Sequence, residues 1–117
     1  MIELTQGEIA DKISILELKE ANGLESPELV ELWKHWKGKE EHLNQLRDIN
    51  SRAWHVVEKL NTFLYDMEGY LTYHKDEVLA DFKRCHFYNR MRVEVKNRIN
   101  EDFNQPVEKK TWKSFTN

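Results

Sequence analysis

The fold of this chain is decided by residues 78–103, which read VLADFKRCHFYNRMRVEVKNRINEDF. At helical periodicity Val78 and Phe82 begin an apolar face, and Ile99 resumes it further along. The turns between them carry Asn89, Arg92 and Lys96, and Asn100 comes just after Ile99. These four polar side chains lie within roughly 80° of one another and overlap the apolar face. Because burying an unpaired cation is costly, Arg92 and Lys96 must meet carboxylates, an anionic ligand or water.

The composition predicts one all-α domain. The chain has 117 residues, of which 33% are charged and 39% hydrophobic, with four glycines and two prolines. This length suits a single domain, and many charges with few helix breakers are typical of a solvated helical protein. The net charge of −3 gives no overall attraction to nucleic acid or to an anionic membrane, so we expect neither as a partner.

The sequence also predicts a cytoplasmic protein. Cys85 is the only cysteine, so an intramolecular disulfide is excluded, which fits a reducing compartment. No stretch approaches the ~18 continuous apolar residues that cross a bilayer, and the opening Met1-Ile2-Glu3 does not begin a signal sequence.

A capping box marks the start of the first expected helix. The side-chain oxygen of Thr5 can accept an early helix N–H, while Glu8 returns to the threonine N–H. Asn22-Gly23 tolerates the left-handed conformation that ends helices. These signals predict a helix over 6–22.

Two further helices follow. Ser26-Pro27 predicts an N-cap and first helical position, and the apolar spacing then continues to residue 74 without a proline. One long helix over 27–74 is favoured, with a kink or break near 48–52 as the alternative because helix propensity is weakest there.

Lys75-Asp76-Glu77 then forms a short polar joint, which predicts a third helix over 77–103 and a tail over 104–117. A short joint makes the second and third helices antiparallel neighbours. The expected fold is therefore a three-helix, coiled-coil-like arrangement in which the short amino-terminal helix packs on a long antiparallel hairpin.

This arrangement brings polar residues from all three helices towards the two cations. Asn61 and Glu68 lie on one flank of the second helix, and Lys12 and Glu17 lie on the edges of the first helix's apolar stripe. The candidate ligand-binding residues are Lys12, Glu17, Asn61, Glu68, Asn89, Arg92, Lys96 and Asn100.

Two interpretations of these residues stay open. In the first, they form a satisfied ion-pair network that fixes the register of the helices. In the second, Arg92 and Lys96 hold a phosphate or carboxylate, while the asparagines and Glu68 orient a hydroxyl or a base.

A third interpretation rests on the basic run from Lys83 to Arg98. This run has six basic residues and one acidic residue, Glu94, which gives a net of five positive charges. Aromatic residues are interleaved with them, and such a helix can bind along a nucleic-acid backbone. Its side chains point all round the helix instead of along one stripe, so an ordinary solvated face is favoured.

We expect no catalysis, no metal and no cofactor. The five histidines include no pair four residues apart, and none lies at zinc-finger spacing from the cysteine. The chain also lacks a P-loop and a Rossmann glycine pattern.

The tryptophans predict a homodimer. Trp33 belongs to the inner apolar stripe of the expected long helix, and Trp36 and Trp54 widen its apolar face. Where that helix projects beyond shorter partners, its exposed half must find another chain, because large bare aromatic patches are rare on monomers.

Residues 4–19, LTQGEIADKISILELK, resemble the opening of a small bacterial and tailed-phage family with no assigned activity, whose signature is GE-hydrophobic-x-DKI[ST]ILE-hydrophobic-K. The similarity continues at Asn61, Asp66, Glu68, Asn89, Arg92, Lys96, Arg98-Ile99-Asn100 and Val107-Glu108-Lys109-Lys110. Tyr65 stands where family members tend to have tryptophan. The resemblance implies an all-helical fold, and a host-cytoplasmic location if the chain is phage-encoded, but no chemistry.

The sequence thus predicts a non-catalytic helical binding protein that holds a phosphorylated small molecule, such as a nucleotide or sugar nucleotide, in a polar pocket between helices. The alternative is a structural protein–protein interaction module without a small-molecule ligand.

Overall fold

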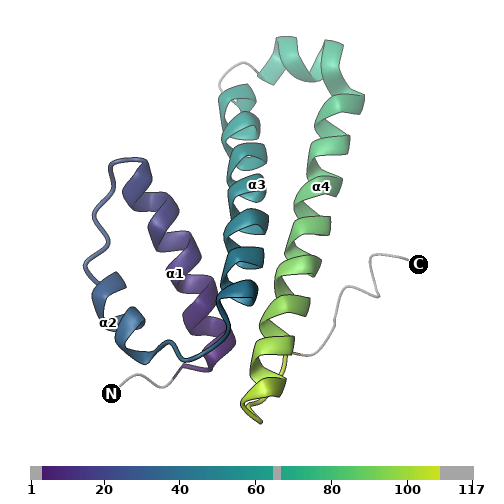
Figure 1. Cartoon of the computed structure of the whole chain (residues 1–117). Helices are drawn as coiled ribbons and strands as arrows, with labels where there is room; N and C mark the ends of the chain where they lie inside the picture. Colours follow the sequence, from purple (N-terminus) through teal and green to yellow (C-terminus); the bar gives the residue numbers. More distant parts are fainter. Residues whose placement is uncertain (1–3, 65–66, 109–117) are drawn as a thin grey trace.

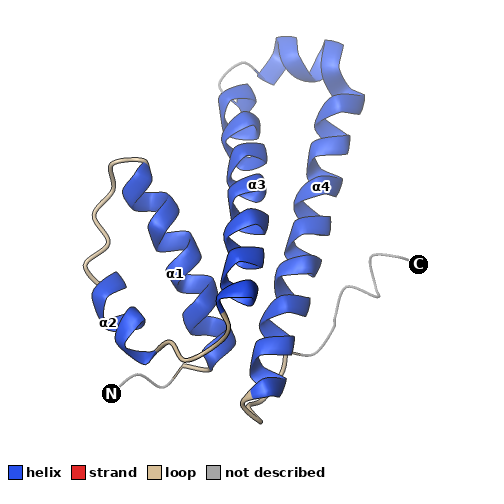
Figure 2. Cartoon of the chain, viewed as in Figure 1, coloured by secondary structure: helices blue, strands red, loops and turns tan. Residues whose placement is uncertain are grey.

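The computed structural model is all-helical and describes residues 4–64 and 67–108. It contains four helices packed together, α1 (Gln6–Ala21), α2 (Leu29–His35), α3 (Glu40–Leu64) and α4 (Met67–Asp102), as Figure 1 shows. Loops join α1 to α2 and α2 to α3, and no strand lies within the described ranges (Figure 2). The all-α prediction is confirmed, although the expected second helix is divided. None of the described helices is long and apolar enough to cross a bilayer.

The boundaries of α1 follow the predicted signals. The Thr5 hydroxyl oxygen accepts the Glu8 backbone N–H at 3.2 Å, which is the expected N-cap. The reverse bond of the capping box differs, because the Thr5 hydroxyl donates to the Glu8 carboxylate. At the other end Gly23 adopts the left-handed φ of 82°, and the helix ends at Ala21.

The predicted continuous helix over 27–74 is wrong, because residues 36–39 interrupt it. The Gln6 side chain compensates for the interruption. Its Nε2 donates to the His35 carbonyl oxygen at 2.9 Å, and its Oε1 accepts the Lys37 backbone N–H at 2.9 Å. Two backbone groups freed by the break are therefore satisfied from α1.

The other expectations about this segment also change. Ser26 does not cap a helix, because its hydroxyl donates to the Leu16 carbonyl oxygen at 3.3 Å and α2 begins at Leu29. The alternative break near 48–52 does not occur, since α3 continues through these residues without interruption. Asn50 is accommodated inside the helix because its side chain bonds to α1 instead of to its own backbone.

α3 ends at Leu64 and α4 begins at Met67, so the two helices are separated earlier in the chain than the predicted joint over 75–77. Residues 75–77 are helical in α4, because this polar segment contains no glycine or proline to stop a helix. Figure 1 shows the first turns of α4 lying across the end of the hairpin before the helix descends beside α3. The predicted end at 103 is close to the observed end at Asp102.

The hydrophobic core lies at the end of the hairpin where α1 packs against both α3 and α4. Its buried side chains come from all four helices: Ile9, Ala10, Ile13, Leu16, Leu29, Leu32, Leu43, Leu46, Ile49, Val95 and Ile99. The break before α3 allows α2 to turn back and contribute Leu29 and Leu32 to the same core. The amphipathic pattern of α3 serves this packing.

The hairpin continues beyond the core as an arm, defined as residues 51–64 of α3 with residues 67–90 of α4 (Figure 1). Among the arm side chains that the structure describes, Val78 is the buried hydrophobic one. The radius of gyration of 16.4 Å exceeds the roughly 13 Å expected for a compact domain of this length. The molecule is therefore a small core with a two-helix projection.

Candidate functional site

Arg92 and Lys96 point towards α1 and meet carboxylates of their own chain. The Lys96 ammonium lies 2.6 Å from Glu108 Oε1 and 4.0 Å from Asp11 Oδ2. Arg92 Nε lies 3.7 Å from Asp11 Oδ1. Lys96 is only 9% exposed. The two cations are thus matched by two internal anions, which offsets much of the cost of their desolvation.

Asp11 is the centre of this polar network, and the sequence interpretation missed it. Its carboxylate accepts a hydrogen bond from Asn50 Nδ2 at 3.0 Å in addition to facing both cations. Asn50 Nδ2 also donates to Ser14 Oγ at 2.6 Å, and the Ser14 hydroxyl donates to the Asp11 carbonyl oxygen at 2.7 Å. All three side chains are buried.

A signal for Asp11 was present in the sequence. Gly7, Asp11 and Ser14 are spaced four and three residues apart, so small or polar side chains follow one stripe of α1 beside the apolar stripe. That stripe faces α4 in the structure, as the contacts of Gly7 and Asp11 show.

Asn100 ties the start of α1 to the end of α4. Its Oδ1 accepts the Gly7 backbone N–H at 2.7 Å, and its Nδ2 donates to the Pro106 carbonyl oxygen at 3.1 Å. The Gly7 N–H is one of the first-turn donors that have no partner inside the helix. Asn100, at 3% exposure, is therefore a buried and fully engaged amide.

Residues 105–108, here called the strap, pass over this part of α4. Asn97 Oδ1 accepts the Glu108 backbone N–H at 2.9 Å, and Asn97 Nδ2 donates to the Glu108 carbonyl oxygen at 3.3 Å. At the near end Gln105 Oε1 accepts the Gln6 backbone N–H at 2.7 Å. The sequence interpretation assigned no role to Asn97, Gln105 or Glu108.

The structure brings three of the eight candidate residues together: Arg92, Lys96 and Asn100. Lys12, Asn61 and Asn89 are exposed. The side chain of Glu68 lies outside the described residues. The predicted eight-residue cluster is therefore not formed.

The altered position of the hairpin turn explains why Asn61 is elsewhere. Lys59 Nζ on α3 lies 2.8 Å from Glu77 Oε1 and 3.1 Å from Asp81 Oδ2 on α4. Asn61 on α3 therefore lies beside the part of α4 near Glu77. Arg92 is much further along α4, so the two residues do not meet.

Glu17 belongs to a second cluster. It accepts hydrogen bonds from Arg47 Nε at 2.9 Å and Arg47 Nη2 at 3.1 Å, and Arg47 Nη1 donates to Glu40 at 2.7 Å. These hydrogen bonds raise the pKa of Arg47, with the one to Glu17 contributing most. The Arg47 guanidinium also lies over the Trp33 ring, 5.7 Å from its centroid. This cluster joins α1, α2 and α3 at the surface.

The basic run between Lys83 and Arg98 does not present one continuous cationic face. Arg92 and Lys96 point inward, and Arg84 Nη1 bonds to the buried Asp81 at 2.7 Å. Lys83 and Arg98 are exposed. The nucleic-acid interpretation gains no support from this arrangement.

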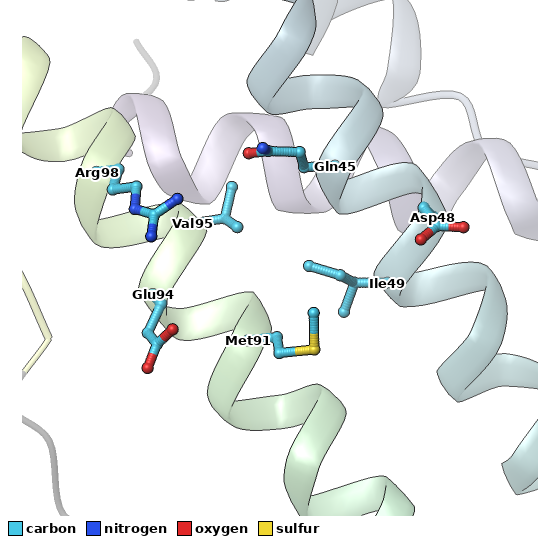
Figure 3. A pocket seen from close by; sticks show the side chains of 7 residues that line it. All are labelled: Gln45, Asp48, Ile49, Met91, Glu94, Val95 and Arg98. Carbon is cyan, nitrogen blue, oxygen red and sulfur yellow. The ribbon is translucent and has the colours of Figure 1, made fainter.

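A hollow of about 210 Å³ lies on another side of α4, between α3 and α4. Figure 3 shows the residues that line it: Gln45, Asp48, Ile49, Met91, Glu94, Val95 and Arg98. Its charged lining is mixed, and neither Arg92 nor Lys96 belongs to it. Within the described ranges no group of three or more histidine, cysteine or acidic side chains is arranged to hold a metal ion.

Comparisons with protein-family models, curated proteins and solved structures find no match to this chain. Any function must therefore be argued from the residues and contacts described above.

Proposed function

We propose that this chain is a helical protein–protein interaction module that pairs with a second copy through its arm. The observation that carries the proposal is the exposure of large apolar side chains on a two-helix projection. Val57 on α3 and Leu79, Phe82 and Phe87 on α4 are exposed by 46%, 49%, 51% and 56%. Two helices shield only one side of each other, and a second hairpin would complete a four-helix bundle.

The inward cations support a structural role in this proposal. Asp11 and Glu108 neutralise Arg92 and Lys96 from within the chain, so no external anion is needed to compensate them. Such a network specifies how α1 sits against α4, since a slip by one turn would separate the charges. A module with a fixed core can then present its arm in one orientation.

The expected affinity is modest. Burying the exposed half of one such side chain contributes about 1 kcal/mol. Four side chains from each copy set an upper limit on the order of 8 kcal/mol, because Phe82 and Phe87 point about 140° apart around α4 and one partner does not cover both fully. The loss of translational and rotational freedom must be subtracted from this limit. The dimer should therefore depend on concentration.

Sedimentation velocity across a range of protein concentrations tests the pairing. The double variant Leu79→Glu/Phe82→Glu should remain monomeric at concentrations where the parent protein dimerises. The matched control is Leu24→Glu/Val30→Glu, which places the same charges at side chains exposed by 53% and 66% outside the arm. A monomeric parent at all concentrations, or equal dissociation by the two variants, would refute pairing through the arm.

Binding of a phosphorylated small molecule is the second candidate function. The observation that favours it is Arg92 Nε, which is buried and has no hydrogen-bond acceptor, since Asp11 is 3.7 Å away. An oxyanion displacing Glu108 would meet Arg92 and Lys96 together.

A thermal-shift panel of nucleotides, sugar nucleotides and sugar phosphates tests this candidate. A compound present at 100 times its Kd adds about 2.7 kcal/mol of stability. Arg92→Met should abolish the shift. If no compound raises the Tm, and Arg92→Met is as stable as the parent, the anion-binding candidate is rejected and the structural role is favoured.

A further inference from the structure

The strap is held to α4 in the way that a protein holds a bound peptide. The Asn97 side chain makes two hydrogen bonds to the backbone of Glu108. Its Oδ1 accepts the Glu108 N–H at 2.9 Å, and its Nδ2 donates to the Glu108 carbonyl oxygen at 3.3 Å. Asn100 donates to the carbonyl oxygen of Pro106 at 3.1 Å. Backbone contacts of this kind recognise an extended segment irrespective of its side chains.

The spacing of these contacts matches an extended peptide. Asn97 and Asn100 are three residues apart on one helix face, where side chains lie about 5–6 Å from each other. They contact residues 108 and 106 respectively, and alternate residues of an extended chain are about 6.6 Å apart. The strap therefore runs antiparallel to α4, and Val107, which lies between the two contacts, is exposed.

Lys96 supplies selectivity for an acidic residue. Its ammonium, in a side chain that is largely buried, lies 2.6 Å from the Glu108 carboxylate. A charged hydrogen bond in a partly dehydrated site is stronger than a neutral one. Glutamine or lysine in place of the glutamate would lose this bond or introduce repulsion.

Two of the three receiving residues also have partners in α1, away from the strap. Asn100 is fixed by the Gly7 N–H at 2.7 Å, and Lys96 lies beside the Asp11 carboxylate at 4.0 Å. Lys96, Asn97 and Asn100 are buried, whereas Pro106, Val107 and Glu108 are all exposed. The site belongs to the folded core, and the strap lies on its surface like a ligand.

We propose that Lys96, Asn97 and Asn100 form a binding site for an extended peptide with a glutamate two residues after the carbonyl group that Asn100 contacts, and that the chain's own residues 106–108 occupy this site in cis. This site is separate from the arm, so the inference goes beyond the proposed function. An intramolecular peptide acts at an effective concentration in the millimolar range, so it excludes the same peptide added from outside. Weakening the strap opens the site.

The test is a titration of the full-length ¹⁵N-labelled chain with the acetylated and amidated peptide Asn-Gln-Pro-Val-Glu, followed by NMR. The readout is the side-chain amide resonances of Asn97 and Asn100. In Glu108→Lys, whose new cation is repelled by Lys96, the peptide should bind saturably and at least about tenfold more tightly than in the parent. Replacing glutamate by glutamine in the peptide should weaken its binding to this variant by about tenfold.

Glu101→Lys is the matched control, because it makes the same charge change at an exposed position of α4. It should exclude the peptide as the parent does. Equal binding to the parent and to Glu108→Lys, no binding to either, or indifference to the peptide's glutamate would overturn the proposal. Failure of Glu108→Lys or Glu108→Ala to fold would also overturn it, since the strap would then be part of the core.

Discussion

The backbone N–H of Gly7 donates to Asn100 Oδ1 at 2.7 Å, and this contact brings the first turn of α1 against the backbone of α4. A Cβ atom at residue 7 would lie 2.5 Å from the Lys96 carbonyl oxygen. Glycine is required here by close approach between two helices, since residue 7 is helical.

Gly7→Ala should therefore destabilise the protein although alanine has the higher helix propensity. The clash is with backbone and cannot be relieved by a rotamer change, so we expect a loss of about 1–3 kcal/mol in the free energy of unfolding. Urea denaturation followed by circular dichroism measures it. Lys12→Ala, at an exposed position of the same helix, should leave the unfolding midpoint nearly unchanged.

Asp11→Asn should be more damaging than its conservative chemistry suggests. It removes the carboxylate that faces both cations, so the partly buried Arg92 loses its anionic partner and Lys96 keeps Glu108 alone. We expect a loss of about 2–4 kcal/mol by chemical denaturation. Asp48→Asn is the comparison, because Asp48 pairs with Arg52 at an exposed surface and its loss should have little effect. Equal effects of the two substitutions would contradict the central role of Asp11.

Gln6→Ala should release the loop between α2 and α3. The Lys37 N–H and the His35 carbonyl oxygen would each lose their partner, which costs about 1–2 kcal/mol. The direct measurement is hydrogen exchange at the Lys37 amide, which should accelerate relative to the amides inside α3. Lys34→Ala, on the exposed side of α2, should leave that exchange rate as it is.

Cys85 should react slowly with alkylating reagents at mildly alkaline pH. Burial raises the pKa of its thiol, and the negative charge of Asp81 adds to the increase. The reactive thiolate is therefore formed only at higher pH than in an unfolded chain. The rate of iodoacetamide labelling, measured against pH in the folded and urea-unfolded protein, should show the folded curve displaced to higher pH. Coincident curves would contradict the predicted shift.

The sequence predicts helix type and several helix ends because those depend on local chemistry. The Thr5 hydroxyl accepts the Glu8 N–H at the start of α1, and Gly23 has a left-handed φ just after α1 ends at Ala21. α4 ends shortly before Pro106. The break at 36–39 was missed because its stabilisation comes from Gln6, which is distant in sequence. The boundary between α3 and α4 was misplaced because neither residues 64–67 nor the predicted joint over 75–77 contain a glycine or proline that would mark it.

The candidate site was only partly predictable for the same reason. The polar positions on the apolar face of α4 indicated Arg92, Lys96 and Asn100, and these three do share one network. Their partners were not evident, because Asp11 lies in a different helix and Glu108 follows the last one. Asn61 was assigned to the site because the predicted joint over 75–77 placed it opposite Arg92. The helices separate earlier in the chain, and this changes which residues of α3 and α4 face each other.

The bonds from Gln6 and Gly7 to Gln105 and Asn100 link residues that are 99 and 93 positions apart in the chain. During translation α1 emerges from the ribosome first, but its opening turn meets its acceptors only after α4 and the residues beyond it have been made. The body of α1 can pack against α2 and α3 before then, but its first turn gains these acceptors only after synthesis of residue 105.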